Sequence, residues 1–169
     1  MADILITGCS GGGKSTLLEE LGRRGQLTVA EPGRRLIAAG ITPWSDLRGF
    51  LHAAADMARA DLGWHADEHR PVFYDRGLID ALAGLERMGE GQVAQALGTQ
   101  RPYAGGVFIV PPWREIFEED DQRRHDFAAV VAEYEHLVQL LPSLGYRAMD
   151  IPRLPVAERA DFVLAALAA

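Results

Sequence analysis

The chain has 169 residues, 48% of them hydrophobic and 24% charged, which is the composition of an ordinary soluble globular protein. This length supports one continuous hydrophobic core and leaves little room for a second, so we expect a single domain over residues 1–169. The net charge of −7 argues against a protein that binds nucleic acid, because such proteins usually present a basic surface to the phosphate backbone.

The sequence shows no sign of a membrane span or a targeting segment. Its apolar runs are all much shorter than the ~20 residues that a helix needs to cross a bilayer. The start, MADILITG, lacks the basic and apolar regions of a signal peptide. Cys9 is the only cysteine, which excludes an intrachain disulfide, and we therefore expect a cytoplasmic protein.

The first half of the chain alternates apolar runs with stretches of helical periodicity. In chain order we predict strand, helix, strand, helix, strand and helix at residues 4–6, 17–21, 27–30, 45–62, 72–74 and 78–85. Gly22 or Gly25 is placed to end the first helix, and Ser45 or Asp46 to cap the second. The last helix follows its strand after a short polar turn.

The second half continues the same alternation. Here we predict strand, helix, strand and helix at residues 107–110, 127–141, 146–151 and 156–167. Pro111 and Pro112 end the first of these strands, and Pro155 suits the first turn of the closing helix. Several strands are apolar at nearly every position, as in strands buried on both faces. The sequence thus predicts an α/β fold with a parallel five-stranded sheet and helices on both faces.

A glycine-rich segment follows the first predicted strand. The segment GCSGGGKS at residues 8–15 fits the pattern G-x-x-x-x-G-K-[ST] and contains Lys14, the only lysine of the chain. Glycines let the backbone N–H groups curl around a phosphate, and the following helix adds the positive end of its dipole. The residues expected to bind a nucleotide triphosphate are Gly8, Ser10, Gly11, Gly12, Gly13, Lys14, Ser15 and Thr16. The alternative is a glycine-rich turn without a ligand.

The segment FYDRG at residues 73–77 supplies a second signal. An acidic residue at the end of a neighbouring strand helps to hold Mg²⁺ in P-loop proteins, and Asp75 has this position. We therefore predict Ser15 and Asp75 as metal ligands and Arg76 as a phosphate contact. The alternative is that Asp75 only caps the following helix.

The segment EPGRR at residues 31–35 follows the second predicted strand. In an open parallel sheet the functional residues gather at the carboxyl ends of the strands, so Glu31 should face the same crevice as Gly8 and Asp75. Glu31 would then take the proton of a phosphate acceptor or orient a metal-bound water. Arg34 or Arg35 would reach an anionic substrate. The alternative is a surface Glu–Arg ion pair around a turn.

At these residues the sequence resembles P-loop kinases. "EPG" after the second strand and "DR" after the third look like thymidylate kinase, but Ala30 stands where that enzyme has an arginine, so its substrate is not carried over. The same pair also resembles the deoxyribonucleoside kinases, in which the glutamate is the base that acts on the sugar hydroxyl.

The whole layout is most similar to a P-loop family labelled predicted AAA-type ATPases, which includes the nicotinamide riboside kinase domain. The matching segments are GCSGGGKST, Glu31 with Arg34, and residues 74–76, 111–113, 120–124 and 151–152. This resemblance implies a three-layer P-loop NTPase fold of the nucleoside- or nucleotide-kinase type.

The resemblance also implies roles for two segments of the second half. Residues 111–126 would be a lid that closes over the phosphates, with Arg114, Arg123 or Arg124 neutralising charge on the transferring group. Pro152 and Arg153 would lie in the loop on the adenine side. The alternative for the lid is a solvated charged segment between a strand and a helix.

Residues near the helix at 45–62 are weaker candidates for acceptor binding. Trp44 is placed to stack on a flat ring, and His52 and Asp56 lie one turn apart on the polar side of the helix. The alternatives are a packing tryptophan and solvated polar side chains.

The resulting hypothesis is an ATP-dependent kinase that uses Mg²⁺ and phosphorylates a hydroxyl or phosphate of a small, nucleoside-like molecule. Lys14, Glu31, Asp75, Arg76, Arg123 and Arg124 would form its catalytic set. The alternatives are a P-loop ATPase with a regulatory role and a protein partner, and a nucleotide-binding module without turnover. No nucleic acid or membrane partner is expected, and the sequence indicates no particular oligomeric state.

Overall fold

A computed structural model describes residues 3–116 and 127–168 of the chain. The described strands are β1 (Asp3–Gly8), β2 (Leu27–Val29), β3 (Val72–Asp75), β4 (Gly106–Val110) and β5 (Ala148–Asp150). The described helices are α1 (Lys14–Arg23), α2 (Pro32–Ala38), α3 (Leu47–Trp64), α4 (Leu78–Arg87), α5 (Val93–Leu97), the short 3₁₀ helix η1 (Arg114–Ile116), α6 (Phe127–Ser143) and α7 (Val156–Ala168).

The strands form a five-stranded sheet in the order β2-β3-β1-β4-β5, and every pair of neighbours is parallel. β1 lies in the centre, where Ile4 is opposite Phe73 of β3 on one side and Gly106 of β4 on the other. The predicted α/β fold with a parallel five-stranded sheet is therefore confirmed. All five strands end at the same edge because they are parallel.

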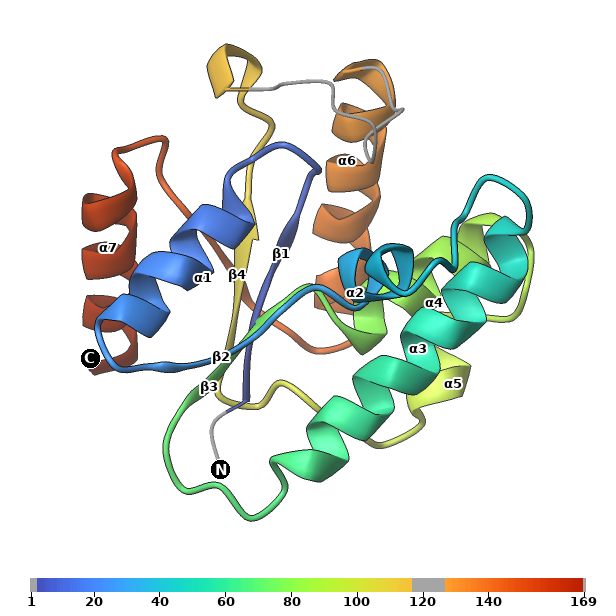
Figure 1. Ribbon diagram of the computed structural model, residues 1–169, viewed down its shortest axis with the longest axis horizontal. Helices are drawn as coiled ribbons and strands as arrows, with labels where there is room; N and C mark the ends of the chain where they lie inside the picture. Colours follow the sequence, from blue (N-terminus) through green and yellow to red (C-terminus); the bar gives the residue numbers. More distant parts are fainter. Residues whose placement is uncertain (1–2, 117–126, 169) are drawn as a thin grey trace.

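Helices cover both faces of the sheet (Figure 1), and each face carries its own hydrophobic core. Successive side chains of a strand point to opposite faces, so Ile4 and Ile6 of β1 pack with α1 and α7, while Leu5 packs on the opposite face. The second face is covered by α2, α3, α4, α5 and α6. This arrangement leaves the carboxyl ends of the strands as the polar edge of the molecule.

Several element boundaries differ from the predictions by a few residues, and the short helix α5 was not predicted; two of the differences have a clear cause. β5 begins at Ala148 rather than at residue 146, because Tyr146 N–H and Gly145 N–H bond back to carbonyls of α6 and end that helix. α3 begins at Leu47 rather than at residue 45, and Asp46 caps it by accepting a hydrogen bond from Gly49 N–H at 2.9 Å. Neither difference moves a strand out of the sheet.

Three chain segments emerge from the carboxyl edge of the sheet beside one another. Gly8 is the last residue of β1, Asp75 is the last residue of β3, and Glu31 is the N-terminal cap residue of α2, shortly after β2. Since β2, β3 and β1 are neighbours in the sheet, these three residues lie at one edge. None of the helices in the described ranges combines the length and the apolar character that a membrane crossing requires.

Candidate functional site

The loop between β1 and α1 has backbone conformations that favour glycine. Gly8, Gly11 and Gly13 have φ angles of 111°, 75° and 76°. A side chain on Gly8 would also place its Cβ 2.3 Å from the carbonyl oxygen of Val110. The loop therefore lies directly on the end of β4 and leads into the N-terminus of α1, whose N–H groups favour an anion.

The lone lysine is buried inside this loop. Lys14 Nζ donates to the carbonyl oxygen of Cys9 at 2.7 Å and to that of Gly8 at 3.3 Å. Burial lowers the pKa of Lys14, and the nearby Arg76 guanidinium lowers it further, while Asp75 opposes the shift. An anionic ligand beside Lys14 would favour its charged form.

Ser15 and Asp75 meet across the gap between α1 and β3. Ser15 Oγ donates to Asp75 Oδ2 at 2.8 Å, while Oδ1 of the same carboxylate is buried and has no hydrogen-bond partner among the described residues. Burial raises the pKa of Asp75, against the opposing effect of Lys14. An orphaned carboxylate oxygen next to a hydroxyl is a donor set that fits Mg²⁺, which prefers oxygen ligands.

Asp75 does not cap the helix that follows it. The cap position of α4 belongs to Gly77, whose N–H donates to Asp80 Oδ2 at 3.1 Å. Asp75 is instead held by Ser15. The structure thus gives no support to the purely structural alternative for Asp75.

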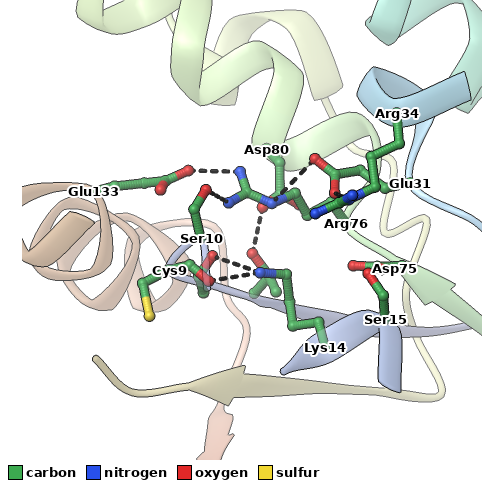
Figure 2. Close-up of polar contacts among 12 residues, drawn as sticks. Cys9, Ser10, Lys14, Ser15, Glu31, Arg34, Asp75, Arg76, Asp80 and Glu133 are labelled. Carbon is green, nitrogen blue, oxygen red and sulfur yellow. Dashed lines mark hydrogen bonds and ion pairs between the residues drawn. The ribbon is translucent and has the colours of Figure 1, made fainter. Parts of the chain in front are cut away.

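Arg76 occupies the centre of the site. Its guanidinium donates to Glu133 Oε1 at 2.6 Å through Nη1 and to Ser10 Oγ at 2.9 Å through Nη2, and its Nε lies 3.6 Å from Glu31 Oε1. Figure 2 shows this guanidinium between Glu133 on one side and Glu31 on the other. Burial lowers the pKa of Arg76, but the carboxylates of Glu133 and Glu31 outweigh it and raise the pKa above its usual value.

The backbone of Arg76 is also unusual. Its φ of 56° lies in the left-handed region that non-glycine residues rarely adopt, and its N–H donates to Ile6 O at 2.9 Å. Such strain, worth about 1 to 3 kcal/mol, persists where surrounding contacts hold it, and it is common at functional sites. The contacts of the guanidinium supply that support here.

Glu31 faces the same space as the loop lysine. Its side chain is 23% exposed and lies 3.4 Å from Arg34 Nε, measured from Oε2. Glu31, Lys14 and Arg76 all line one cavity of about 420 Å³. The structure thus brings together the three charged groups that the sequence placed at separate strand ends.

This cavity has a charged end and an apolar end. Its volume falls within the range of about 300 to 1,000 Å³ that is typical of small-molecule sites. Charged and polar groups cluster where the glycine loop, β3 and α6 meet. The apolar lining comes from α2, α3, α4, α6 and the connection between α2 and α3, including Ile37, Pro43, Leu47, Phe50, Leu51, Met88, Val130 and Leu137.

Two carboxylates of the site were missed by the sequence analysis. Glu133 projects from α6 onto Arg76, which lowers the pKa of Glu133 although burial opposes this shift. Asp80 of α4 accepts a short hydrogen bond from Thr7, and burial raises its pKa to about 6. A signal existed for Glu133, because Val130 and Leu137 flank it at helical spacing. Asp80 lies outside the leucine stripe of α4, so no such pattern marks it.

Arg159 of α7 was also missed. This buried arginine donates from Nη1 to Gly13 O at 3.2 Å and to Gly12 O at 3.3 Å, and its guanidinium lies 5.7 Å from the ring centre of Trp113. Arg159 therefore holds the glycine loop from the side opposite to the cavity.

The weaker substrate candidates are distributed differently from the expectation. Arg34 lines the cavity. Arg35 does not, because its Nη1 pairs with Asp61 Oδ2 of α3 at 2.7 Å. Trp44 is 45% exposed and lies outside the cavity lining. Arg34 is therefore placed to meet a ligand in the cavity, whereas the acceptor roles of Arg35 and Trp44 stay predictions that the cavity lining does not support.

His52 and Asp56 lie on a different side of α3 from the cavity. His52 Nε2 is 2.8 Å from Glu90 Oε2, and Asp56 pairs with Arg59. The side of α3 that lines the cavity carries Phe50 and Leu51. Each further residue along a helix is rotated by about 100°, so the side chain at position 52 points away from the cavity. His52 and Asp56 therefore do not line the cavity, and their acceptor role stays a prediction.

The candidates on the lid and the adenine side are only partly described. Arg123 and Arg124 lie outside the described residues, so their role stays a prediction. The guanidinium of Arg114 lies 4.8 Å from the ring centre of Phe127, and Arg153 donates to Pro112 O at 2.5 and 3.1 Å. Pro152 and Arg153 do not line the cavity, and they stay predictions as nucleotide contacts.

The sheet order, the glycine loop with its buried lysine, and the acidic residue at the end of β3 define a P-loop fold of the kinase type. The chain belongs to the AAA domain family, because the model of this family matches residues 3–159. This membership agrees with the resemblance read from the motifs. A search of curated proteins gave no match.

Solved structures of P-loop kinases share the fold. Deoxyadenosine kinase from M. mycoides with bound dATP aligns with a TM-score of 0.66 and 14% identity over 100% of both chains. Shikimate kinase from Acinetobacter baumannii in complex with shikimate aligns with a TM-score of 0.59 and 16% identity over 99% of this chain and 93% of that chain. Shikimate kinase from Aquifex aeolicus gives a TM-score of 0.61 and 14% identity over 98% and 96% of the two chains. The TM-scores show a common fold, and at identities this low the likeness shows the fold alone.

Proposed function

We propose that this protein is an ATP- and Mg²⁺-dependent phosphotransferase that acts on a small, nucleoside- or nucleotide-like metabolite. One observation carries the proposal: Lys14, Glu31 and Arg76 line a single cavity beside the Ser15–Asp75 pair. A triphosphate-binding loop alone would not need a carboxylate on the facing wall. The kinase folds of the structural neighbours support the same reaction class.

The glycine loop would bind the β- and γ-phosphates. Lys14 and the N–H groups at the start of α1 supply positive charge to the phosphate oxygens. Ser15 and Asp75 would hold Mg²⁺, which neutralises the charge that develops on the phosphates during transfer. The unpaired oxygen of Asp75 is available for this role within the described structure.

Glu31 would activate the acceptor. An acceptor hydroxyl oxygen attacks the γ-phosphorus of ATP. The bond between the γ-phosphorus and the β,γ-bridging oxygen breaks, and ADP leaves. The hydroxyl proton passes to a carboxylate oxygen of Glu31, which faces the cavity. Arg76, with Arg114, Arg123 or Arg124 from the lid segment, would stabilise charge on the transferring group.

The shape of the cavity favours an acceptor with two chemically different ends. Glu31 and Arg76 suit a polar, hydroxyl-bearing end, while Phe50 and Leu51 offer an apolar wall. A flat ring attached to a sugar matches both ends. We therefore favour a nucleoside-like acceptor among the small hydroxyl compounds.

The test is transfer of labelled γ-phosphate from ATP to a pooled panel of metabolites. We expect label on one metabolite for the unmodified protein. Glu31→Gln should keep MgATP affinity and lower transfer by about 10²- to 10⁴-fold, because general-base catalysis contributes this much. Glu19→Gln, an exposed change on α1, is the matched control. Label found only in inorganic phosphate would favour a regulatory ATPase, and full transfer by Glu31→Gln would remove Glu31 from the mechanism.

A further inference from the structure

Glu133 reaches the site from a helix that the P-loop motifs do not include. α6 follows the lid segment in the chain and packs near the sheet on the side of α4 (Figure 1). The Glu133 side chain is 23% exposed and lines the cavity opposite Glu31. Its carboxylate accepts a hydrogen bond of 2.6 Å from Arg76 Nη1.

The Arg76 guanidinium is therefore shared among groups of the protein itself. Nη1 serves Glu133, Nη2 serves Ser10, and Nε lies close to Glu31 (Figure 2). The Nε group has no hydrogen-bond partner among the described residues. A phosphate group on the acceptor would therefore compete with Glu133 for Nη1, and at Nε it would meet the carboxylate of Glu31.

Three carboxylates surround the Arg76 guanidinium. Glu31, Glu133 and Asp80 all act on this one group, while Lys14, Arg34 and Arg87 line other parts of the same cavity. Arg34, the next arginine, is itself 3.4 Å from Glu31, and Arg87 lies on the exposed end of α4. An acceptor phosphate carries about −1.5 to −2 charges at neutral pH, so the carboxylates of Glu31 and Glu133 would repel it from Arg76, whereas a hydroxyl can donate to either carboxylate.

Resting on the proposed function, we propose that Glu133 is a specificity-determining residue that excludes phosphate-bearing acceptors and admits acceptors with neutral hydroxyl groups. Glu133 does this in two ways. It occupies Nη1 of the Arg76 guanidinium, and it adds a second negative charge facing Glu31. Building a like charge against the wrong ligand is a common source of specificity.

Binding of inorganic phosphate tests the proposal without any turnover. The glycine loop is first saturated with Mg²⁺ and an unhydrolysable ATP analogue, and phosphate is then titrated by calorimetry. Glu133→Gln should bind phosphate at least about tenfold more tightly than the unmodified protein, because one like charge has been removed from a partly buried site. Glu135→Gln, an exposed change of the same charge on the same helix, should bind phosphate as the unmodified protein does.

Two further measurements separate charge from packing. Glu133→Asp keeps the charge, so it should bind phosphate as weakly as the unmodified protein. The proposal would be overturned if Glu133→Asp and Glu133→Gln bound phosphate equally more tightly than the unmodified protein, or if Glu133→Gln showed no gain in phosphate affinity. In the unmodified protein, nucleosides should accept label at least about tenfold better in kcat/KM than the matching 5′-monophosphates, for the same electrostatic reason.

The two proposals fail in different ways. Equal transfer to nucleosides and their monophosphates would refute the role of Glu133 and leave the kinase intact. Transfer to no acceptor at all would refute the kinase, while the phosphate titration would still report on Glu133.

Discussion

Replacing Asp80 by asparagine isolates the cost of one buried negative charge. Asp80 accepts hydrogen bonds from the Thr7 hydroxyl and from Gly77 N–H. An asparagine amide can keep both contacts, because its oxygen accepts from Gly77 and its NH₂ group donates to Thr7 Oγ1. The variant therefore removes the charge and preserves the local hydrogen bonding.

The pKa gives the size of the effect. Burial raises the pKa of Asp80 from 3.8 to about 6, although the Arg76 guanidinium opposes this shift. A shift of about two units, at about 1.4 kcal/mol each, corresponds to about 3 kcal/mol. The folded state holds this proton more tightly than the unfolded chain does. The free energy of unfolding therefore falls by this amount as the pH rises from about 4 to about 6, and it stays lower above that range.

Urea unfolding of Asp80→Asn should show this pH dependence directly. At pH 7.5 the variant should be more stable than the unmodified protein by up to about 3 kcal/mol. This advantage should be mostly lost near pH 4, where Asp80 is protonated in the folded state and about half protonated in the unfolded chain. Asp67→Asn, an exposed change, is the control. A stability difference that is the same at both pH values would refute the reasoning, since a charge penalty has to titrate. We also expect Asp80→Asn to transfer phosphate more slowly than the unmodified protein. A carboxylate that lowers the free energy of unfolding and lies next to Arg76 is the kind of group that is retained for function.

Three other variants or reagents test the glycine loop. Lys14→Ala should weaken MgATP binding by roughly 30- to 150-fold in calorimetry, because hydrogen bonds to charged groups are worth about 2 to 3 kcal/mol; unchanged affinity would contradict the loop assignment. Gly8→Ala should destabilise the protein in thermal unfolding by more than Gly25→Ala does, because both have positive φ but only the first adds a Cβ 2.3 Å from Val110 O; equal losses would mean that the close approach is not limiting. Alkylation of buried Cys9 should slow in proportion to MgATP occupancy, and equal rates with and without nucleotide would place the ligand elsewhere.

The parts of the site that follow from neighbouring residues could be predicted from the sequence. The glycine loop is one continuous segment, so its pattern contains the whole geometry from Gly8 to Ser15. Asp75 and Glu31 required one further rule, namely that parallel strands end at a common edge. That rule was sufficient because the three strands involved are neighbours in the sheet.

The parts that depend on helix packing could not be predicted in the same way. Glu133 meets Arg76 across 57 positions of the chain, and Arg159 meets Gly12 across 147. Helical periodicity shows that these side chains lie on buried faces, but it does not say which loop or strand end each face will contact. A charged residue within an apolar stripe was the available signal.

The acceptor side shows a different limit. The pattern of α3 indicated correctly that it is amphipathic, yet both of its flanks carry polar residues. The side that faces the cavity is decided by the packing of α3 against α2 and α4, which brings Phe50 and Leu51 forward and turns His52 away. The sequence alone therefore gave no physical reason to choose one polar flank of α3 over the other as the side that contacts the substrate.

The clamp of Arg159 on the glycine loop has a consequence for the order of events during synthesis. The loop is made among the first residues of the chain, but the guanidinium that holds Gly12 and Gly13 in place is made almost at the end of the described structure. A growing polypeptide on the ribosome would carry the complete phosphate-binding motif long before the motif is braced. Nucleotide would then be captured only after α7 has been made, and a chain without α7 would have little ability to sequester ATP.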